Sequence, residues 1–139
     1  SGLYAHGEVP DAASQEIEEF ALCSGEIVWV ASEDMLDRLT AVAGSGPGYV
    51  FEMLRAYIEA AENLGFSAED ARTMVLGTVQ GTLEMARQSD LSLEELRNSV
   101  TSKGGTTAAG LGALNGDGGY SELIRQTLDA AYKRAVELR

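Results

Sequence analysis

Two adjacent glycines followed by two threonines, at residues 104–107, form the stretch of this sequence best suited to chemistry. Glycine frees the backbone from ordinary steric limits, and threonine is a good N-cap residue. Apolar residues recur at helical spacing after them, so we expect a helix that begins near Thr106. The first turn of a helix has unpaired N–H groups and a partial positive charge, which suit a carboxylate or a phosphate. A capped helix after a tight turn, without a ligand, is the alternative interpretation.

Helices are the elements that must position this stretch, because apolar residues repeat about every 3.6 residues along most of the chain after residue 31. Ser67 with Asp70, and Ser92 with Glu95, are typical of capping boxes at helix N-termini. Gly65 suits the position just past a helix end. The pattern predicts helices over about 32–43, 47–64, 67–87, 92–100, 106–114 and from 121 towards the end of the chain, with a glycine-rich turn at 115–119.

The first 31 residues have a different pattern. Residues 2–6 and 27–30 predict two short strands, and Asp11 is expected to cap a helix that ends near Cys23. A strand, a helix and a strand in this order look like the last piece of an α/β domain. No Gly-x-Gly-x-x-Gly follows a strand in this sequence, so the nucleotide-binding part of such a domain is missing from it. Cys23, the single cysteine, is expected to be buried as a small hydrophobe.

Acidic residues dominate the charge of the chain. The net charge is −12; residues 1–37 hold nine acidic and no basic side chains, whereas residues 38–139 hold 13 acidic and ten basic ones. This balance argues against nucleic acid or an anionic membrane as a partner, and indicates two pieces joined near Asp37. No apolar run approaches the roughly 20 residues that span a bilayer, and a cytoplasmic location is expected. His6 has no cysteine or second histidine nearby, so no metal site is expected.

Small residues are frequent in the helical part, and aromatic residues are few. Such helices cross closely but bury little area per residue. We therefore expect a homodimer whose two copies complete one core; a monomeric bundle is the alternative. Gly77 and Gly81 lie inside one predicted helix, where each costs about 1 kcal/mol relative to alanine. Close approach of another backbone would explain them, and we expect a helix crossing there.

Two segments resemble motifs of the pyrroline-5-carboxylate reductases. Residues 44–49 read Gly-Ser-Gly-Pro-Gly-Tyr, which is similar to the Gly-Ser-Gly-Pro-Ala-Tyr segment of that family. Residues 99–107 read Ser-Val-Thr-Ser-Lys-Gly-Gly-Thr-Thr and look like the family's signature. The order of the two segments and the distance between them fit as well. The similarity runs from about residue 26 to 139, and residues 1–31 are similar to the end of the family's dinucleotide-binding domain.

The resemblance implies a mainly α chain, in which a helical dimerisation bundle follows a short β-α-β remnant of a Rossmann-type domain. The two parts would be residues 1–32 and 33–139. The family reduces 1-pyrroline-5-carboxylate to L-proline with NADPH or NADH, in proline biosynthesis. This chain would be the C-terminal fragment of such an oxidoreductase and supply the homodimer interface and the substrate site. The missing part would bind the cofactor, so none is expected on this chain alone.

The resemblance also implies the residues of a substrate site. The loop that holds the substrate carboxylate corresponds to Ser102, Gly104, Gly105, Thr106 and Thr107. Thr107 corresponds to the catalytic hydroxyl near the ring nitrogen of the substrate. Lys103 stands where many members have proline, and its positive charge would favour a carboxylate. The loop expected to support the site comprises Ser45, Gly46 and Pro47.

Two other functions fit the same residues. A non-catalytic dimeric module related to the enzyme would bind a small carboxylate or nothing. A phosphate-binding protein would use the same helix N-terminus, although no arginine cluster supports that function. A Gly-x-Gly-x-x-Gly strand-turn-helix upstream in the open reading frame would favour the enzyme.

Overall fold

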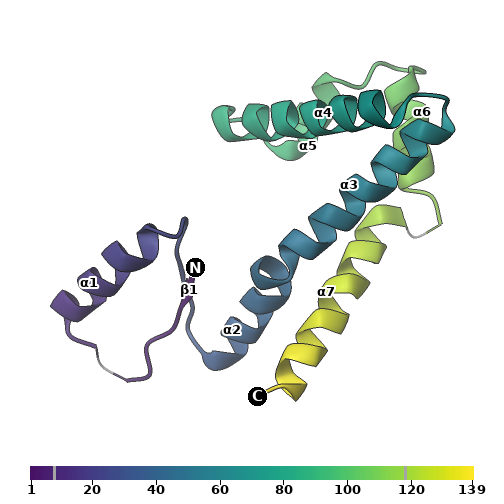
Figure 1. Ribbon diagram of the computed structural model, residues 1–139. Coiled ribbons are helices and arrows are strands. Elements are labelled where there is room, and N and C mark those ends of the chain that lie inside the picture. Colours follow the sequence, from purple (N-terminus) through teal and green to yellow (C-terminus); the bar gives the residue numbers. More distant parts are fainter. Residues whose placement is uncertain (8, 118) are drawn as a thin grey trace. The chain divides into compact units, whose positions relative to one another are not determined.

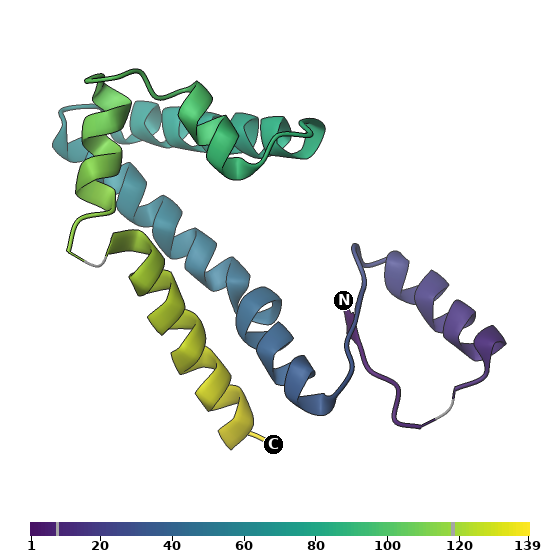
Figure 2. The same ribbon diagram turned by 180° about the vertical axis from the view of Figure 1, so that it is seen from behind.

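The computed structural model describes residues 1–7, 9–117 and 119–139 (Figures 1 and 2). Its contacts divide the chain into two compact units, one made of Ser1–Pro47 with Arg125–Arg139 and the other of Gly48–Ile124. The described elements are β1 (Gly2–Leu3), α1 (Asp11–Leu22), β2 (Val28–Trp29), α2 (Glu33–Leu39), the π-helical turn η1 (Thr40–Gly44), α3 (Gly46–Asn63), α4 (Ala68–Gln88), α5 (Leu93–Ser99), α6 (Thr106–Leu114) and α7 (Gly119–Glu137). The mainly α fold class with a short β-α-β segment is therefore confirmed.

The two strands pair with each other in parallel. Gly2 lies opposite Val28 and Leu3 opposite Trp29, and the Val30 N–H donates to the Leu3 carbonyl at 2.8 Å. Both strands are shorter than the sequence predicts, and β1 ends at Leu3. The reason is that β2 is followed almost at once by the N-terminus of α2. Among the described residues, β1 therefore has only this short strand to pair with.

Helix α1 differs from its prediction at both ends. Pro10 occupies the N-cap position without a side-chain hydrogen bond, and Asp11 is the first helical residue. Asp11 is therefore not the cap, although an acidic side chain in the first turn suits the helix dipole. Cys23 is exposed rather than buried, because it follows the end of a helix in which Ala21 is the buried residue.

Helix α2 begins as predicted and continues through η1. The Ser32 hydroxyl caps it by accepting a hydrogen bond from the Met35 N–H at 3.3 Å. The Ser45 N–H reaches back to the Thr40 carbonyl at 2.8 Å, which is the wider spacing of a π-turn. The predicted break over residues 44–48 is thus confined to Ser45, since α3 already begins at Gly46.

The second unit begins with the hairpin of α3 and α4, which diverge from their connection (Figure 1). Gly65 turns the chain with a φ of +102°, and the Asp70 N–H donates to the Ser67 hydroxyl at 3.1 Å. Both features confirm the predicted helix end and start. The core of the hairpin comprises Ala61, Ala71 and Val75, with Leu54 and Ile58 packed against them.

Gly77 and Gly81 on α4 face open space. A Cβ at either position would meet nothing within 4 Å. The close helix crossing expected there is therefore not made by any described part of this chain, and a crossing with a second chain stays a prediction.

The remaining helices follow their predictions closely. The capping box of Ser92 and Glu95 is complete in both directions, and α6 begins at Thr106. Helix α7 begins at Gly119, two residues before the predicted start. The predicted turn at 115–119 includes Gly118, which lies outside the described residues.

The described part of the chain lacks two kinds of feature. No helix there is long and apolar enough to cross a membrane. No group of three or more His, Cys, Asp or Glu side chains there is arranged to hold a metal ion.

Candidate functional site

The predicted site lies between α5 and α6, in the unit Gly48–Ile124. Helix α5 ends in local hydrogen bonds: the Thr101 hydroxyl donates to the Arg97 carbonyl at 2.6 Å, and the Thr101 N–H donates to the Asn98 carbonyl at 3.1 Å. These bonds fix the chain immediately before the glycine-containing turn. The start of the turn is therefore anchored to a helix whose own N-terminus has a complete capping box.

Gly104 and Gly105 serve different purposes in this turn. Gly104 has a φ of +72°, a left-handed conformation that favours glycine. The Gly105 N–H donates to the Ser102 carbonyl at 3.1 Å, which closes the turn. A Cβ at Gly105 would lie 2.3 Å from Oγ of Ser102 and 3.3 Å from the Ser102 carbonyl oxygen. Gly104 is thus favoured by its backbone conformation, and Gly105 by the lack of room for a side chain.

The N-terminus of α6 is open. Gly105 is the N-cap, and no side chain caps the helix. Thr106 and Thr107 are therefore the first helical residues and not caps, which corrects the interpretation that favoured a threonine cap. The first carbonyl of the helix, that of Gly105, accepts from the Ala109 N–H at 3.2 Å. The N–H groups before Ala109 consequently have no intrahelical acceptor.

The two threonine hydroxyls are available for a ligand. Both residues are exposed, and neither hydroxyl has a hydrogen-bond partner in the described part of the chain. Lys103 is exposed in the same turn. An anion placed at this helix terminus would meet free N–H groups, the positive end of the helix dipole and one nearby cationic side chain.

The predicted site residues fall into two groups. One segment of the unit Gly48–Ile124 holds Ser102, Gly104, Gly105, Thr106 and Thr107. The predicted supporting loop belongs to the other unit, at the junction of η1 and α3, and comprises Ser45, Gly46 and Pro47. Its role in supporting the site stays a prediction.

A polar cluster in the unit of Ser1–Pro47 and Arg125–Arg139 was not predicted. We call it the α2–α7 cluster; it comprises Asp34, Arg38 and Tyr132. The Tyr132 hydroxyl donates to one carboxylate oxygen of Asp34, and Nε of Arg38 donates to the other at 2.7 Å. The Arg38 guanidinium lies 4.7 Å from the centroid of the Tyr132 ring. The i,i+4 pair on α2 was readable in the sequence, but its tyrosine partner lies 98 residues away.

Hydrogen bonding shifts the titration of this cluster. The Tyr132 hydroxyl, and after it Arg38, hold the pKa of Asp34 below its ordinary value. The same carboxylate raises the pKa of the Tyr132 hydroxyl, because a phenolate could not donate the hydrogen bond.

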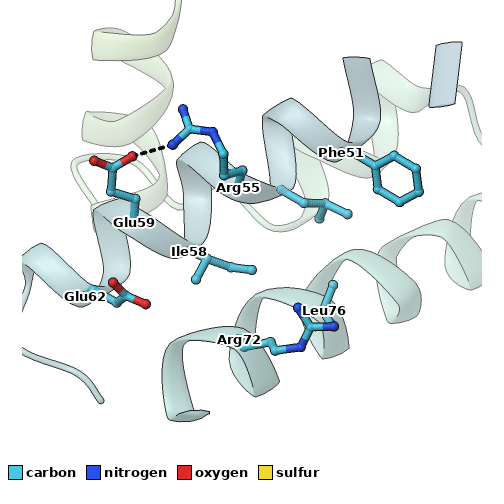
Figure 3. Close-up of a pocket in the computed structure, with 8 residues that line it drawn as sticks. Phe51, Arg55, Ile58, Glu59, Glu62, Arg72 and Leu76 are labelled. Atoms are coloured by element: carbon cyan, nitrogen blue, oxygen red, sulfur yellow. Dashed lines mark hydrogen bonds and ion pairs between the residues drawn. The ribbon is translucent and has the colours of Figure 1, made fainter. Parts of the chain in front are cut away.

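A hollow of about 580 Å³ lies between α3 and α4. Figure 3 shows Ile58 and Leu76 pointing into it from the two helices, with Phe51 at one end. The rim is charged: Arg55 pairs with Glu59 at 2.7 Å and with Glu52 at 2.7 Å, which lowers the pKa of the Glu52 carboxyl. An apolar floor with a charged rim is typical of a surface that another protein chain covers.

Comparison with known proteins agrees with the two sequence motifs. The family model for pyrroline-5-carboxylate reductase dimerisation matches residues 33–138. The pyrroline-5-carboxylate reductase of Pseudomonas aeruginosa is 38% identical over 138 residues, which cover 99% of this chain and 50% of that protein. That of Staphylococcus aureus is 36% identical with the same coverage. The chain thus spans about half the length of the curated relatives it matches.

Solved structures give the same result. A pyrroline-5-carboxylate reductase from Coxiella burnetii has a TM-score of 0.92 and 39% identity, covering 99% of this chain and 50% of that one. A pyrroline carboxylate reductase from Plasmodium falciparum, solved with NADP bound, has a TM-score of 0.86 and 26% identity, covering 96% of this chain and 51% of that one. The resemblance seen in the sequence is confirmed, and the chain belongs to the pyrroline-5-carboxylate reductase dimerisation family.

Proposed function

We propose that this chain is the substrate-binding and dimerisation part of a pyrroline-5-carboxylate reductase, which reduces 1-pyrroline-5-carboxylate to L-proline. The observation that carries the proposal is the uncapped N-terminus of α6, held by the turn of Gly104 and Gly105. The substrate has one carboxylate and one imine. The turn and the helix that follows it offer a different group to each.

The substrate carboxylate would bind at the start of α6. The N–H groups of Thr106, Thr107 and Ala108 point out of the helix end without intrahelical acceptors. Bonds from several N–H groups to one carboxylate are charge-assisted and stronger than neutral ones. Ser102 lies over the Gly105 Cα, so its hydroxyl is placed at the edge of the same cradle.

The hydroxyl of Thr107 would orient the imine. It is exposed, it belongs to the first turn of α6, and it has no other partner among the described residues. A hydroxyl both donates and accepts, so it can hydrogen-bond the ring nitrogen before and after that nitrogen gains a proton. The bound nicotinamide would supply the hydride to the adjacent ring carbon.

The cofactor would bind outside this chain. A relative from Plasmodium falciparum was solved with NADP bound, and this chain matches about half of it. Residues 1–139 hold no Gly-x-Gly-x-x-Gly fingerprint after a strand. We therefore assign residues 1–32 to the end of a dinucleotide-binding domain and residues 33–139 to the helical domain. NADPH or NADH would serve the complete enzyme.

The partner of the helical part would be a second copy. Among the described residues of the unit Gly48–Ile124, the buried hydrophobic ones are Ala61, Ala71 and Val75, whereas Phe51 is 71% exposed and Leu83 is 60% exposed. Exposed apolar side chains in this density mark an interaction surface. The name of the matching family, dimerisation, favours a homodimer, and the open face at Gly77 and Gly81 leaves room for a helix of that second copy.

The proposal is tested by adding L-proline, the expected product, to the 139-residue chain while following its backbone amides by NMR. We expect shifts at 106–108, because the carboxylate would bind those N–H groups. Prolinamide, which lacks the carboxylate, is the matched control and should leave them in place. Equal shifts with inorganic phosphate alone would favour the phosphate-binding function. Binding of proline by a complete protein that has no reductase activity would favour the non-catalytic module.

A further inference from the structure

Helix α2 is tied directly to the strand pair. The Val30 N–H is hydrogen-bonded to the Leu3 carbonyl at 2.8 Å, and the helix cap, Ser32, follows two residues later. A Cβ at Gly2 would lie 2.6 Å from Cδ1 of Leu39, so the last turn of α2 lies against β1. Any rotation of α2 would therefore carry the β1–α1–β2 segment with it or break these contacts.

Apolar packing around α2 is incomplete. In the described part of the unit Ser1–Pro47 with Arg125–Arg139, the buried hydrophobic residues are Ala21 and Ala41. A hollow of about 770 Å³ separates parts of the strand pair from α2 and η1. Leu36 and Leu39 on α2 and Leu128 on α7 are only half-buried, so their apolar contacts stabilise α2 less than full burial would. Polar contacts with α7 therefore add to what fixes the direction of α2.

The contacts within the α2–α7 cluster restrict the orientation of α2 relative to α7. Asp34 uses both carboxylate oxygens, one for Tyr132 and one for Arg38. The Arg38 guanidinium lies over the Tyr132 ring, so each of the three side chains contacts the other two. A single exposed ion pair contributes little stability. Three mutually bonded groups on two helices instead restrict how one helix turns against the other.

A second contact joins the same two segments. Arg139, just beyond α7, forms an ion pair with Asp37 on α2. The Asp37 side chain is only 14% exposed, and the contact is an ion pair rather than a hydrogen bond. Asp37 lies one turn from Asp34 along α2, and the same guanidinium lies 3.8 Å from the Asp34 carboxylate, so Arg139 extends the contact between α2 and the end of α7 over one helical turn.

We propose that Asp34, Arg38 and Tyr132 act as a clasp that fixes the direction of α2, and with it the β1–α1–β2 segment, on α7. The consequence for catalysis rests on the proposed function. In the complete reductase, the nucleotide-binding part would continue from this segment and would be held in one orientation on a helix of the dimerisation part. The three are positioning residues, because none of them belongs to the substrate loop.

Hydrogen–deuterium exchange on the 139-residue chain tests the clasp. In Tyr132→Phe the ring stays and the hydroxyl is lost, so we expect the N–H groups of Val28, Val30 and residues 36–39 to exchange several-fold faster. Asp34→Asn should have the same effect. The double variant should exchange no faster than the stronger single variant, because both substitutions remove one shared interaction. The core of α3 and α4 should stay as protected as in the parent chain.

Two controls separate the clasp from general effects. Asp34 also lies in the first turn of α2, where acidic residues favour the helix dipole. Glu33→Gln removes a charge from the same turn without touching the cluster, and should leave exchange at Val28 and Val30 unchanged. Tyr57→Phe removes an exposed hydroxyl from α3 and should also leave it unchanged. Equal acceleration in Glu33→Gln, acceleration spread over the whole chain, or none in Tyr132→Phe would overturn the clasp.

The complete reductase tests the consequence separately. Tyr132→Phe should lower kcat several-fold and leave the apparent KM for 1-pyrroline-5-carboxylate unchanged, since the substrate loop is intact. An unchanged kcat would overturn the catalytic consequence. Should the exchange result hold in a protein without reductase activity, the clasp would stand and the proposed function would fail.

Discussion

Thr107 and Gly105 are two residues apart, but in the proposed site they would act on a ligand through different atoms. Thr107 offers a hydroxyl, whereas Gly105 offers the absence of a side chain beside Ser102. Substitutions at the two positions should therefore change different kinetic constants of the complete reductase.

Thr107→Val keeps the shape of the side chain and removes the hydroxyl. The imine would lose its hydrogen bond, while the carboxylate would keep the N–H groups of α6. We expect kcat to fall by more than the apparent KM changes, with a loss of about 1–3 kcal/mol in transition-state stabilisation. Thr106→Val, at the preceding position, is the matched control. Unchanged kcat and KM in Thr107→Val would remove the hydroxyl from the mechanism.

Gly105→Ala adds a methyl group where there is no room. The new Cβ would lie 2.3 Å from Oγ of Ser102, so the serine must rotate and the turn must shift. The apparent KM for the substrate should rise more than kcat falls, because the carboxylate cradle itself is displaced. The double variant with Ser102→Gly tests this cause, since it removes the clashing side chain and should restore part of the affinity. Steady-state kinetics on the two variants would decide.

Because of the Asp34–Tyr132 hydrogen bond, we expect the stability of the folded chain to fall both at low pH and at high pH. The pKa of Asp34 is lowered in the folded chain, so its contribution is full above the ordinary value and is lost as the pH falls through the lowered one. The pKa of Tyr132 is raised, so its contribution is full below the ordinary value and is lost as the pH rises through the raised one. Thermal unfolding of Tyr132→Phe should therefore differ from the parent most between these limits. An equal difference at every pH would contradict this.

At the scale of elements, helix starts could be predicted from neighbouring residues, whereas contacts between residues far apart in the sequence could not. The helix starts at Ser32, Ser67 and Ser92 were readable because a cap depends on a hydroxyl and an N–H three residues later. The start of α6 was predicted at the right residue from two glycines before an apolar repeat, although no threonine caps it. Asp11 was misread as a cap, since Pro10 fills that position. The tyrosine partner of Asp34 was beyond prediction, because nothing local specifies a contact over 98 residues.

Substitutions at Gly81 on α4 should affect the stability of the helix within one chain and the stability of the dimer differently. Within this chain a Cβ there meets nothing within 4 Å, so Gly81→Ala should stabilise the helix by about 1 kcal/mol. Gly81→Leu should gain similar helix propensity in the monomer yet overpack a crossing partner, at a cost of roughly 1–3 kcal/mol to the dimer. Sedimentation of the two variants measures this difference. A Gly81→Leu dimer as stable as the parent would place the crossing elsewhere.

At the scale of the whole molecule, the chain has features expected for dimerisation but lacks one that catalysis needs. The described part of the α3–α4 hairpin buries Ala61, Ala71 and Val75 but exposes many larger side chains, including Phe51 and Leu83. Burying apolar surface is the main driving force of association. The chain therefore exposes apolar surface that a second copy would cover, whereas its 139 residues contain no fingerprint for binding the hydride donor.

The 139-residue chain should accordingly form dimers and reduce nothing. Its exposed apolar side chains would be covered by a second copy, so sedimentation should show a dimer at micromolar concentration. With 1-pyrroline-5-carboxylate and NADPH it should give no turnover, because a reduced nicotinamide must be held beside the ring carbon for hydride transfer. The same assay on a protein that also carries an upstream dinucleotide-binding half is the control and should show turnover. Turnover by the short chain alone would place the cofactor site within residues 1–139, and a dilute monomer would assign the open face of α4 to some other partner.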